Sequence, residues 1–353
     1  MFLIHKPINN KNMKTLNKKS ILNLRTLVLS GVISVSMFAV SCNKADDNNP
    51  KTEPATATQD IPGLLKTISG NPEFFTDQNG EMKKGGKVPT FGILMSALEK
   101  TKLTSTVAKN RLTVFAPSDD AFRNLFAALG INGIDDLTAE QLKPILLYHV
   151  LGSPVFSYQL KAGFVPTLNG AAVEVKLGNG VMINDAKVIR ADMKALNGAL
   201  HVIDKVLLPP SKNIVEIASG NPAFSILVQA VVKAGLADAL ATGGPFTVFA
   251  PTNDAFVALL GELGASSLDD IPVDVLRSVL LYHVVSGRVY SSDLPAGPLT
   301  VKTLNGGTFE INAPTLKIKD FNNREANLVP ALLNIQATNG VIHVIDRVIL
   351  PQL

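Results

Sequence analysis

Four of the five histidines in this 353-residue chain occur at repeat-matched positions, and histidine can bind a metal or act as a general base. His149 corresponds to His283, and His201 corresponds to His343. The two histidines of a set are 52 residues apart in the first copy and 60 in the second, and no acidic residue stands at a short ligand spacing from either. This arrangement argues against a metal site, and we predict no metal and no cofactor.

The histidine that follows a tyrosine falls on the apolar face of a predicted helix. Leu142, Ile145, Leu146 and His149 are spaced as i, i+3, i+4 and i+7, and the second copy repeats the spacing up to His283. The ring would then lie near the helix C-terminus, where carbonyl groups need donors. We therefore expect a buried histidine that connects helix and sheet, with ligand contact and metal binding as the two alternatives.

The acidic residues and the known sequence motifs do not predict catalysis. Asp119 and Asp120 follow a proline at a helix start, where an acid stabilises exposed N–H groups. We expect Asp204 and Asp346 to fix turns or to accept bonds from backbone amides. There is no G-x-S-x-G or H-E-x-x-H motif. We predict no catalytic residue and a protein that is not an enzyme, and a hydrolase remains an alternative without a nucleophile–base pair.

Three short segments predict turns or loops rather than functional sites. Asn197-Gly198 and Asn339-Gly340 are typical of hairpin turns. The segment GEMKKGGK at 80–87 superficially resembles a phosphate-binding loop, but Val88 follows its last lysine and no strand precedes it. We expect a solvated loop there.

Composition excludes several classes of protein. The chain is 46% hydrophobic and 18% charged, which is typical of globular domains. Residues 1–41 hold six basic residues and no acid, so the remainder has 27 basic against 29 acidic residues and no basic stripe. Nucleic acid is therefore not an expected partner. The lack of Trp and the presence of only 4 Tyr make large stacking surfaces improbable.

The N-terminus has the pattern of a secretory signal. Basic residues precede an apolar run from Thr26 to Val40, which is too short for a membrane-spanning helix. The run ends in Ala39-Val40-Ser41-Cys42 and resembles a bacterial lipoprotein lipobox, in which the only cysteine, Cys42, is lipidated. Asn43 after the cysteine and the Asp46-Asp47 pair resemble outer-membrane and surface-export signals of Bacteroidota lipoproteins. We expect membrane attachment through lipid on Cys42, in the outer membrane and exposed on the surface.

The rest of the chain is duplicated. LTVFAPSDDAF at 112–122 recurs as FTVFAPTNDAF at 246–256 with 8 of 11 positions identical, and LLYHV and NGxxHVID also occur twice. We predict a lipoprotein signal peptide at 1–41, a disordered tether at 42–60, and two domains at 61–210 and 211–353. In each copy helical spacing comes first and alternating apolar residues follow, which predicts an α+β fold.

Three local patterns in the first copy predict particular elements. Thr113–Ala116 is a short apolar run that predicts a buried strand. Thr138 with Gln141 forms a capping box that predicts the start of a helix. The run His201–Leu208 predicts a further strand.

The two copies differ in length at two places. The first carries 17 extra residues near 74–90, and the second carries several within 313–336. The first insertion is polar and basic, with Lys83, Lys84 and Lys87, and is a candidate interaction loop because scaffolds vary their functional loops. A loop without function is the alternative.

The segments TVFAPSDDAF, YHV and NGALHVID, in this order and in two copies, resemble the fasciclin-like (fasciclin I) domain family over about 290 residues. The resemblance implies two tandem β-sandwich wedges with flanking helices and a non-enzymatic, extracellular adhesion role. In animal members the Tyr-His pair is linked to integrin recognition, and the matching residues here are Tyr148-His149 and Tyr282-His283. A bacterium has no integrin of its own, so the partner does not carry over.

Two functions from different classes follow. The favoured one is a lipid-anchored cell-surface adhesion protein that binds an extracellular protein or matrix through its tandem domains. The alternative is a glycan-binding accessory lipoprotein of an envelope polysaccharide-uptake system, whose ligand would be a polysaccharide.

Overall fold

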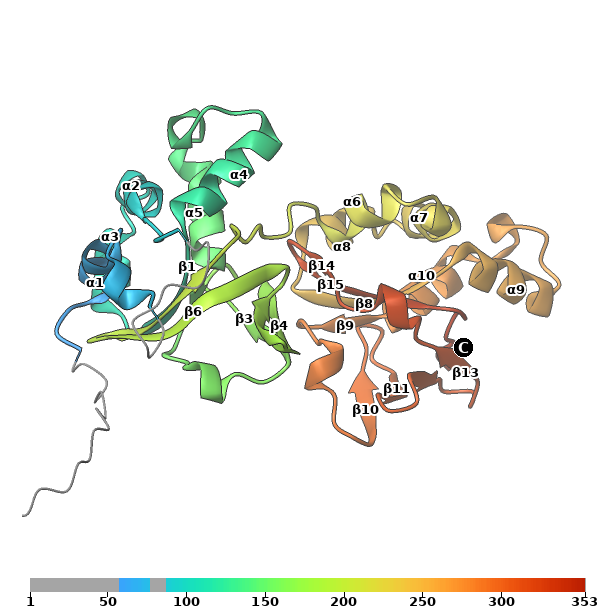
Figure 1. The fold of residues 1–353 in the computed structure, drawn as a ribbon. Coiled ribbons are helices and arrows are strands. Elements are labelled where there is room, and N and C mark those ends of the chain that lie inside the picture. The colour runs from blue at the N-terminus through green and yellow to red at the C-terminus, as the bar shows by residue number, and fades with distance from the viewer. Residues whose placement is uncertain (1–56, 77–86, 353) are drawn as a thin grey trace, which may run out of the picture. The chain divides into compact units, whose positions relative to one another are not determined.

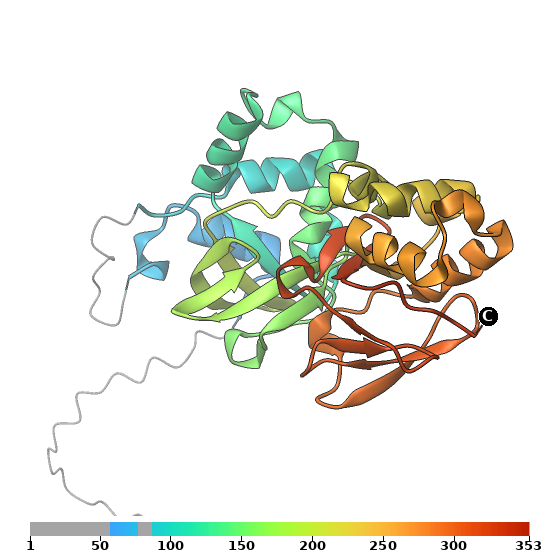
Figure 2. The same ribbon diagram turned by 90° about the vertical axis from the view of Figure 1, so that its right-hand side faces the viewer.

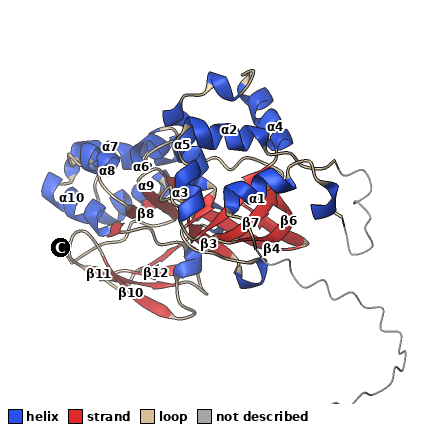
Figure 3. Cartoon of the chain, turned by 90° about the vertical axis from the view of Figure 1, so that its left-hand side faces the viewer, coloured by secondary structure: helices blue, strands red, loops and turns tan. Residues whose placement is uncertain are grey.

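The computed structural model describes residues 57–76 and 87–352 and contains the two repeats expected from the sequence (Figure 1). In each repeat the helices gather on one side of the central strands (Figures 1 and 3). Along these residues, no helix combines the length and the apolar composition needed to span a bilayer. The α+β prediction is confirmed.

The first repeat begins with helices and ends with strands. Its helices are α1 (Ile61–Ile68), α2 (Gly92–Lys100), α3 (Thr104–Lys109), α4 (Asp119–Leu129) and α5 (Ala139–Tyr148). Its strands are β1 (Leu112–Pro117), β2 (Val150–Leu151), β3 (Gly163–Pro166), β4 (Ala172–Gly178), β5 (Gly180–Ile183), β6 (Ala186–Ala195) and β7 (Gly198–Ile203). They form one sheet in the order β2-β1-β7-β6-β5-β4-β3, in which only β1 and β7 are parallel.

The second repeat has the same succession of elements, except that two short strands stand in place of one long strand. Its helices are α6 (Ile214–Ser219), α7 (Ser225–Lys233), α8 (Ala237–Thr242), α9 (Asn253–Leu263) and α10 (Val273–Tyr282). Its strands are β8 (Phe246–Pro251), β9 (Val284–Ser286), β10 (Pro298–Lys302), β11 (Thr308–Asn312), β12 (Lys317–Lys319), β13 (Glu325–Asn327), β14 (Ile335–Ala337) and β15 (Gly340–Ile345). They form two sheets, β14-β15-β8-β9 and β10-β11-β12-β13. The second of these lies on the side away from the helices (Figure 2).

The central strand pair of each repeat is covered on both faces. All six residues of β1 and of β7 are buried, because helices cover one face and the remaining strands fold back over the other. Two apolar clusters result, one around Phe122 under the helices and one around Phe115 between the strands. Strands buried on both faces have continuous rather than alternating apolar residues, which is why Thr113–Ala116 appears as an apolar run.

Local sequence signals set several element boundaries. Ser118 accepts a bond from the Ala121 N–H and caps α4, and Thr138 with Gln141 forms the predicted capping box of α5. The strand predicted over 201–208 is placed differently: β7 begins at Gly198 and ends at Ile203, and the chain beyond it is irregular. The apolar residues of that tail, Val206 and Leu207, are buried without forming a strand.

Candidate functional site

The Tyr-His pairs lie where a helix ends and the sheet begins. His149 directly follows the last residue of α5, and its Nδ1 is 2.8 Å from the carbonyl oxygen of Ile145. Its Nε2 accepts a hydrogen bond of 2.9 Å from the N–H of Leu207. The ring is therefore buried and bonded as predicted, but it connects the helix to the irregular segment after β7 rather than to a strand of the sheet.

The second repeat reproduces this arrangement. His283 Nδ1 is 2.8 Å from the carbonyl oxygen of Val279, and the N–H of Ile349 donates to Nε2 at 3.1 Å. A carbonyl only accepts and an amide N–H only donates, so both rings are neutral with the proton on Nδ1. Burial disfavours the charged form and lowers the pKa of His149 and of His283 to about 4.

The adjacent tyrosines are equally enclosed. The Tyr148 hydroxyl donates to the carbonyl oxygen of Ala172 at 2.7 Å and accepts from the Asn184 side chain at 3.2 Å. Tyr282 is fully buried and donates to the Thr308 carbonyl at 2.5 Å. Burial raises the pKa of Tyr282 to about 12.

These contacts correct the prediction of an interaction surface at the Tyr-His pairs. The four side chains are at most 2% exposed, and their polar atoms are bonded within the chain. A partner could reach them only if the helix separated from the sheet. The buried, connecting interpretation describes them, and direct ligand contact does not; the residues concerned are Tyr148, His149, Tyr282 and His283.

The other matched histidines also bond to backbone. His201 Nε2 is 2.9 Å from the Val155 carbonyl oxygen, and the Asp192 N–H donates to Nδ1 at 3.2 Å. His343 makes the matching contact to the Val289 carbonyl at 2.9 Å. Burial lowers the pKa of both rings. In the described part of the chain, no three His, Cys, Asp or Glu side chains gather as metal ligands.

Asp119 does more than the sequence indicated. The expectation was that it stabilises the start of its own helix, but its carboxylate reaches α2 instead. One oxygen accepts from the N–H of Ile93 at 2.8 Å, and the other accepts from the Thr90 hydroxyl at 2.5 Å and the Gly92 N–H at 3.3 Å. The side chain of Asn253 binds the Ile226 N–H in the same way in the second repeat. The residue therefore joins two helices.

The remaining acids accept bonds from backbone amides as predicted. Asp204 accepts from the N–H of Lys187 at 2.7 Å, and Asp346 accepts from the N–H of Asn327 at 2.7 Å. Both bonds connect the segment after the last strand of a repeat to a neighbouring strand. This is a structural role.

The Asn-Gly pairs turn the chain and also bind two further segments. Asn197 lies in the two-residue turn between β6 and β7, so the hairpin prediction is confirmed. Its side chain accepts from the Ile61 N–H at 2.9 Å and donates to the carbonyls of Val107 and Asn110 at 2.6 and 2.8 Å. Asn339 does the same in the second repeat. Recurrence of the asparagine in both copies was the only sequence signal for this role.

The predicted basic loop and the predicted lipid site are mostly outside the described residues. Cys42, Lys83 and Lys84 are among them, so their predicted roles remain predictions. Lys87 is described: it is exposed, and its Nζ is 3.3 Å from a carboxylate oxygen of Asp120. That pair helps to lower the pKa of Asp120.

A stacked aromatic pair, of which one member is exposed, was not predicted from the sequence. Tyr158 is 80% exposed, and its ring stacks on that of Phe156 with centroids 5.9 Å apart and planes 5° from parallel. The loop is held by Asp192, which accepts from the N–H of Ser157 at 2.6 Å. Ser292 occupies the position of Tyr158 in the second repeat. This break in the repeat symmetry could have identified the position.

Comparison with known proteins decides the family. A model of the fasciclin domain matches residues 89–209 and again 222–351. The chain belongs to the fasciclin domain family. Both fasciclin domains contain the Tyr-His pair, the second matched histidine and the Asn-Gly turn described above.

Relatives of this chain come from animals and cyanobacteria. It is 31% identical over 245 residues to pig transforming growth factor-beta-induced protein ig-h3, covering 68% of this chain and 34% of that protein. It is 42% identical over 150 residues to protein sll1483 of Synechocystis, covering 42% of this chain and 79% of that one. It is 30% identical over 249 residues to human periostin, covering 69% of this chain and 29% of that protein.

A solved structure also matches. The fasciclin domain pair from the insect cell adhesion molecule fasciclin I has 22% sequence identity and a TM-score of 0.36, covering 74% of this chain and 97% of that one. The chain spans about a third of the length of ig-h3 and of periostin.

Proposed function

We propose that this protein is a non-enzymatic, lipid-anchored surface protein whose two fasciclin domains bind an extracellular protein or matrix. One observation carries the proposal: the polar side chains that recur in both domains are bonded inside the fold. His149 and His283 exemplify this, since each ring bonds backbone through both nitrogens. Chemistry at these positions would require breaking the contacts that hold helix and sheet together.

The anchor is the predicted lipid on Cys42. Each buried CH₂ group contributes about 0.8 kcal/mol to membrane attachment, so several acyl chains anchor a protein stably. The signal-like run before Cys42 and the acidic pair after it support export to the surface of the outer membrane. Two joined domains then bind more strongly than one, because the second contact forms at high effective concentration.

The contact surface that we propose centres on the exposed Tyr158 and the half-buried Phe156 on which it stacks. Exposed aromatic residues are enriched at protein interfaces and supply contact area at low entropy cost. The stacked geometry and the bond from Ser157 to Asp192 hold the pair in place before a partner arrives.

The test uses the mature chain from residue 42, with Cys42→Ser to prevent lipidation, and immobilised extracellular matrix proteins. Saturable binding that falls at least tenfold in Tyr158→Ser supports the proposal. Val257→Ser is the matched control, since Val257 is 60% exposed on α9 in the other domain. Absence of binding to every matrix protein and to whole-cell surface material would contradict the adhesion function.

A glycan-binding accessory protein of a polysaccharide-uptake system is the second candidate. The observation in its favour is the same stacked pair, because sugar rings pack on exposed aromatic faces. A glycan array with the chain from residue 42 separates the two functions. Saturable sugar binding that is lost in Tyr158→Ser would favour this candidate. Binding to matrix proteins without binding to any sugar on the array would eliminate it.

The proposed location has its own experiment. Protease added to intact cells should remove the domains from the wild-type protein, because a surface lipoprotein is accessible from outside. Cys42→Ser should release the protein from the membrane fraction. Full protection of the wild-type protein would place the domains inside the envelope and rule out adhesion.

A further inference from the structure

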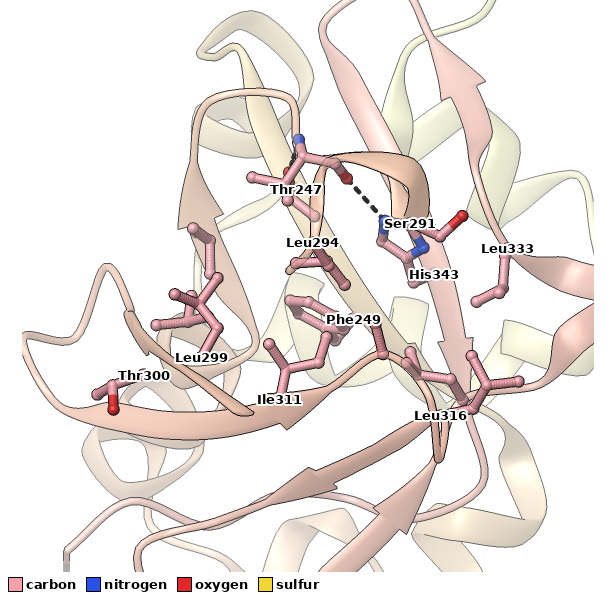
Figure 4. Close-up of a pocket in the computed structure, with 15 residues that line it drawn as sticks. Thr247, Phe249, Ser291, Leu294, Leu299, Thr300, Ile311, Leu316, Leu333 and His343 are labelled. Atoms are coloured by element: carbon pink, nitrogen blue, oxygen red, sulfur yellow. Dashed lines mark hydrogen bonds between the residues drawn. The ribbon is translucent and has the colours of Figure 1, made fainter. Parts of the chain in front are cut away.

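The second fasciclin domain contains a cavity of about 200 Å³ between its two sheets (Figure 4). Phe249 of β8 lies at its centre, with Leu299 of β10 on one side and Leu333 on the other. Ile311 of β11 and Leu316 line the lower wall. Apolar side chains thus enclose most of the space.

The cavity follows from a break in one strand. In the first domain β6 runs as one strand with bulges from Ala186 to Ala195 and pairs with both β5 and β7, so that all strands form one sheet. In the second domain the corresponding chain forms β13, a 3₁₀ turn at Pro330–Leu332, and β14. Leu328 and Leu333 flank this turn and both line the cavity.

The buried polar side chains of the wall, those of Thr247 and His343, already have partners. The Thr247 hydroxyl donates to the Gly287 carbonyl at 2.8 Å and accepts from the Val289 N–H at 2.9 Å. His343 bonds the Val289 carbonyl at 2.9 Å, and its ring stacks on Phe249. No lysine, arginine, aspartate or glutamate lines the cavity. A ligand would therefore have to be uncharged over its buried part.

The size and the opening restrict the ligand further. A dry cavity of about 150 Å³ accepts benzene, so this one has room for on the order of eight carbon atoms. Leu299 is 37% exposed, and Leu316 and Leu333 are half-buried, so the space opens to solvent beside them. An aliphatic chain can enter the cavity there while the polar head group of the same molecule stays in water.

We propose that this cavity binds the aliphatic chain of a lipid-type molecule. The chain would lie between β8 and β11 and pack on Phe249, and its head group would remain outside beside Leu299. This activity goes beyond the proposed adhesion function and does not depend on it. Fatty acids, alcohols and larger lipids share the chemistry of the buried part.

The experiment uses the chain from residue 42 with Cys42→Ser and measures by isothermal titration calorimetry the binding of octanoate, 1-octanol and toluene. Octanoate and 1-octanol, whose chains match the size of the cavity, should both bind, because the head group stays in solvent. Binding of octanoate alone would indicate a head-group site, and binding of toluene alone would indicate a ring-binding site. Either of these results, or no binding at all, overturns the proposal.

A filled cavity is the decisive variant. Val301→Phe adds a ring to a half-buried wall residue of β10 and should reduce affinity at least tenfold. The control is Val165→Phe, at the matched position of β3 in the first domain, which should bind as the wild type does. Thermal melting checks folding, and Leu316→Phe fills the space from another side if Val301→Phe unfolds. Unchanged affinity in a folded filled variant contradicts the proposal.

Discussion

The two fasciclin domains keep the same internal bonds but not the same sheet. In both, a histidine at the end of α5 or α10 connects the helix to the segment after the last strand, and an asparagine in the last hairpin binds two other segments. The first domain has one seven-stranded sheet, whereas the second has two four-stranded sheets with a cavity between them. The buried polar bonds are thus the fixed part of the fold, and the outer strands can vary.

The two domains also differ in exposed and cavity-lining residues at matched positions. Tyr158 is exposed on the first domain, and its counterpart in the second is Ser292. The cavity residue Leu299 has Gly163 as its counterpart in the first domain. Each domain therefore carries its own candidate contact feature on a shared framework.

The largest effect is expected where a side chain would collide with backbone in both domains. A Cβ on Gly198 would lie 1.8 Å from the Leu112 carbonyl oxygen, and one on Gly340 would lie 2.2 Å from that of Phe246. Gly198→Ala and Gly340→Ala should each destabilise by about 3 kcal/mol or more in urea unfolding, because strands β1 and β8 cannot move away.

The control for these substitutions is Gly178→Ala in β4, where no atom lies within 4 Å of the added Cβ. It should leave the free energy of unfolding unchanged or slightly higher. If Gly198→Ala were as stable as Gly178→Ala, the close parallel pairing of β1 and β7 would be refuted.

Acid should destabilise both domains through their buried imidazoles. His149 and His283 have pKa values of about 4 when folded, below the 6.5 of a free ring, so the unfolded chain binds protons first as pH falls. The contribution of these rings to the free energy of unfolding is therefore complete above about pH 6.5 and decreases toward pH 4. The loss is roughly 2 kcal/mol per ring at pH 5. Urea unfolding between pH 5 and 6.5 should show this slope, since few carboxylates titrate there.

The double variant His149→Ala/His283→Ala is the control for the pH dependence of the free energy of unfolding. Its stability should depend much less on pH over the same interval. An identical slope in the variant and the wild type would assign the pH dependence to other groups.

Removal of one ring should destabilise the two domains equally. In His149→Ala the N–H of Leu207 and the carbonyl of Ile145 lose their partner while buried, which costs on the order of 1–3 kcal/mol. His283→Ala should fall in the same range, as measured by thermal or urea unfolding. At temperatures where these variants remain folded, we expect them to bind the partner as the wild type does. Loss of binding in a folded variant would indicate that the rings have a functional role.

The smallest effect is expected where one domain receives the residue of the other. Asp119→Asn places in α4 the side chain that Asn253 supplies in α9. The amide oxygen can still accept from the Ile93 N–H, and the Gly92 N–H loses its acceptor, so the loss should be about 1 kcal/mol. Asp119→Ala should cost more than Asp119→Asn in the same unfolding measurement, and equal losses would show that the helix contact is unimportant.

Much of the framework was predictable because local signals determine it. The Thr138–Gln141 capping box, the apolar run at Thr113–Ala116 and the Asn197 turn all appear where the sequence placed them. Helical spacing also placed His149 on the buried face of α5, and from there the prediction of a connecting ring followed.

The rest depended on contacts between distant residues. Asp119 bonds Ile93 and Asn197 bonds Val107, over 26 and 90 residues, and no local pattern encodes such pairs. The family resemblance suggested Tyr148 as a contact residue, but burial depends on the strands that cover it. Tyr158 was overlooked because composition reports how many tyrosines exist and not which one is exposed.

The central claim is that the matched histidines are structural, and NMR of their rings tests it most directly. In ¹⁵N-labelled chain from residue 42, His149 and His283 should remain neutral with the proton on Nδ1 and titrate near pH 4. His201 and His343 should remain neutral with the proton on Nε2, since that atom faces a carbonyl. Titration of any of these rings near pH 6.5, or a shift of their signals on addition of Zn²⁺, would contradict the account.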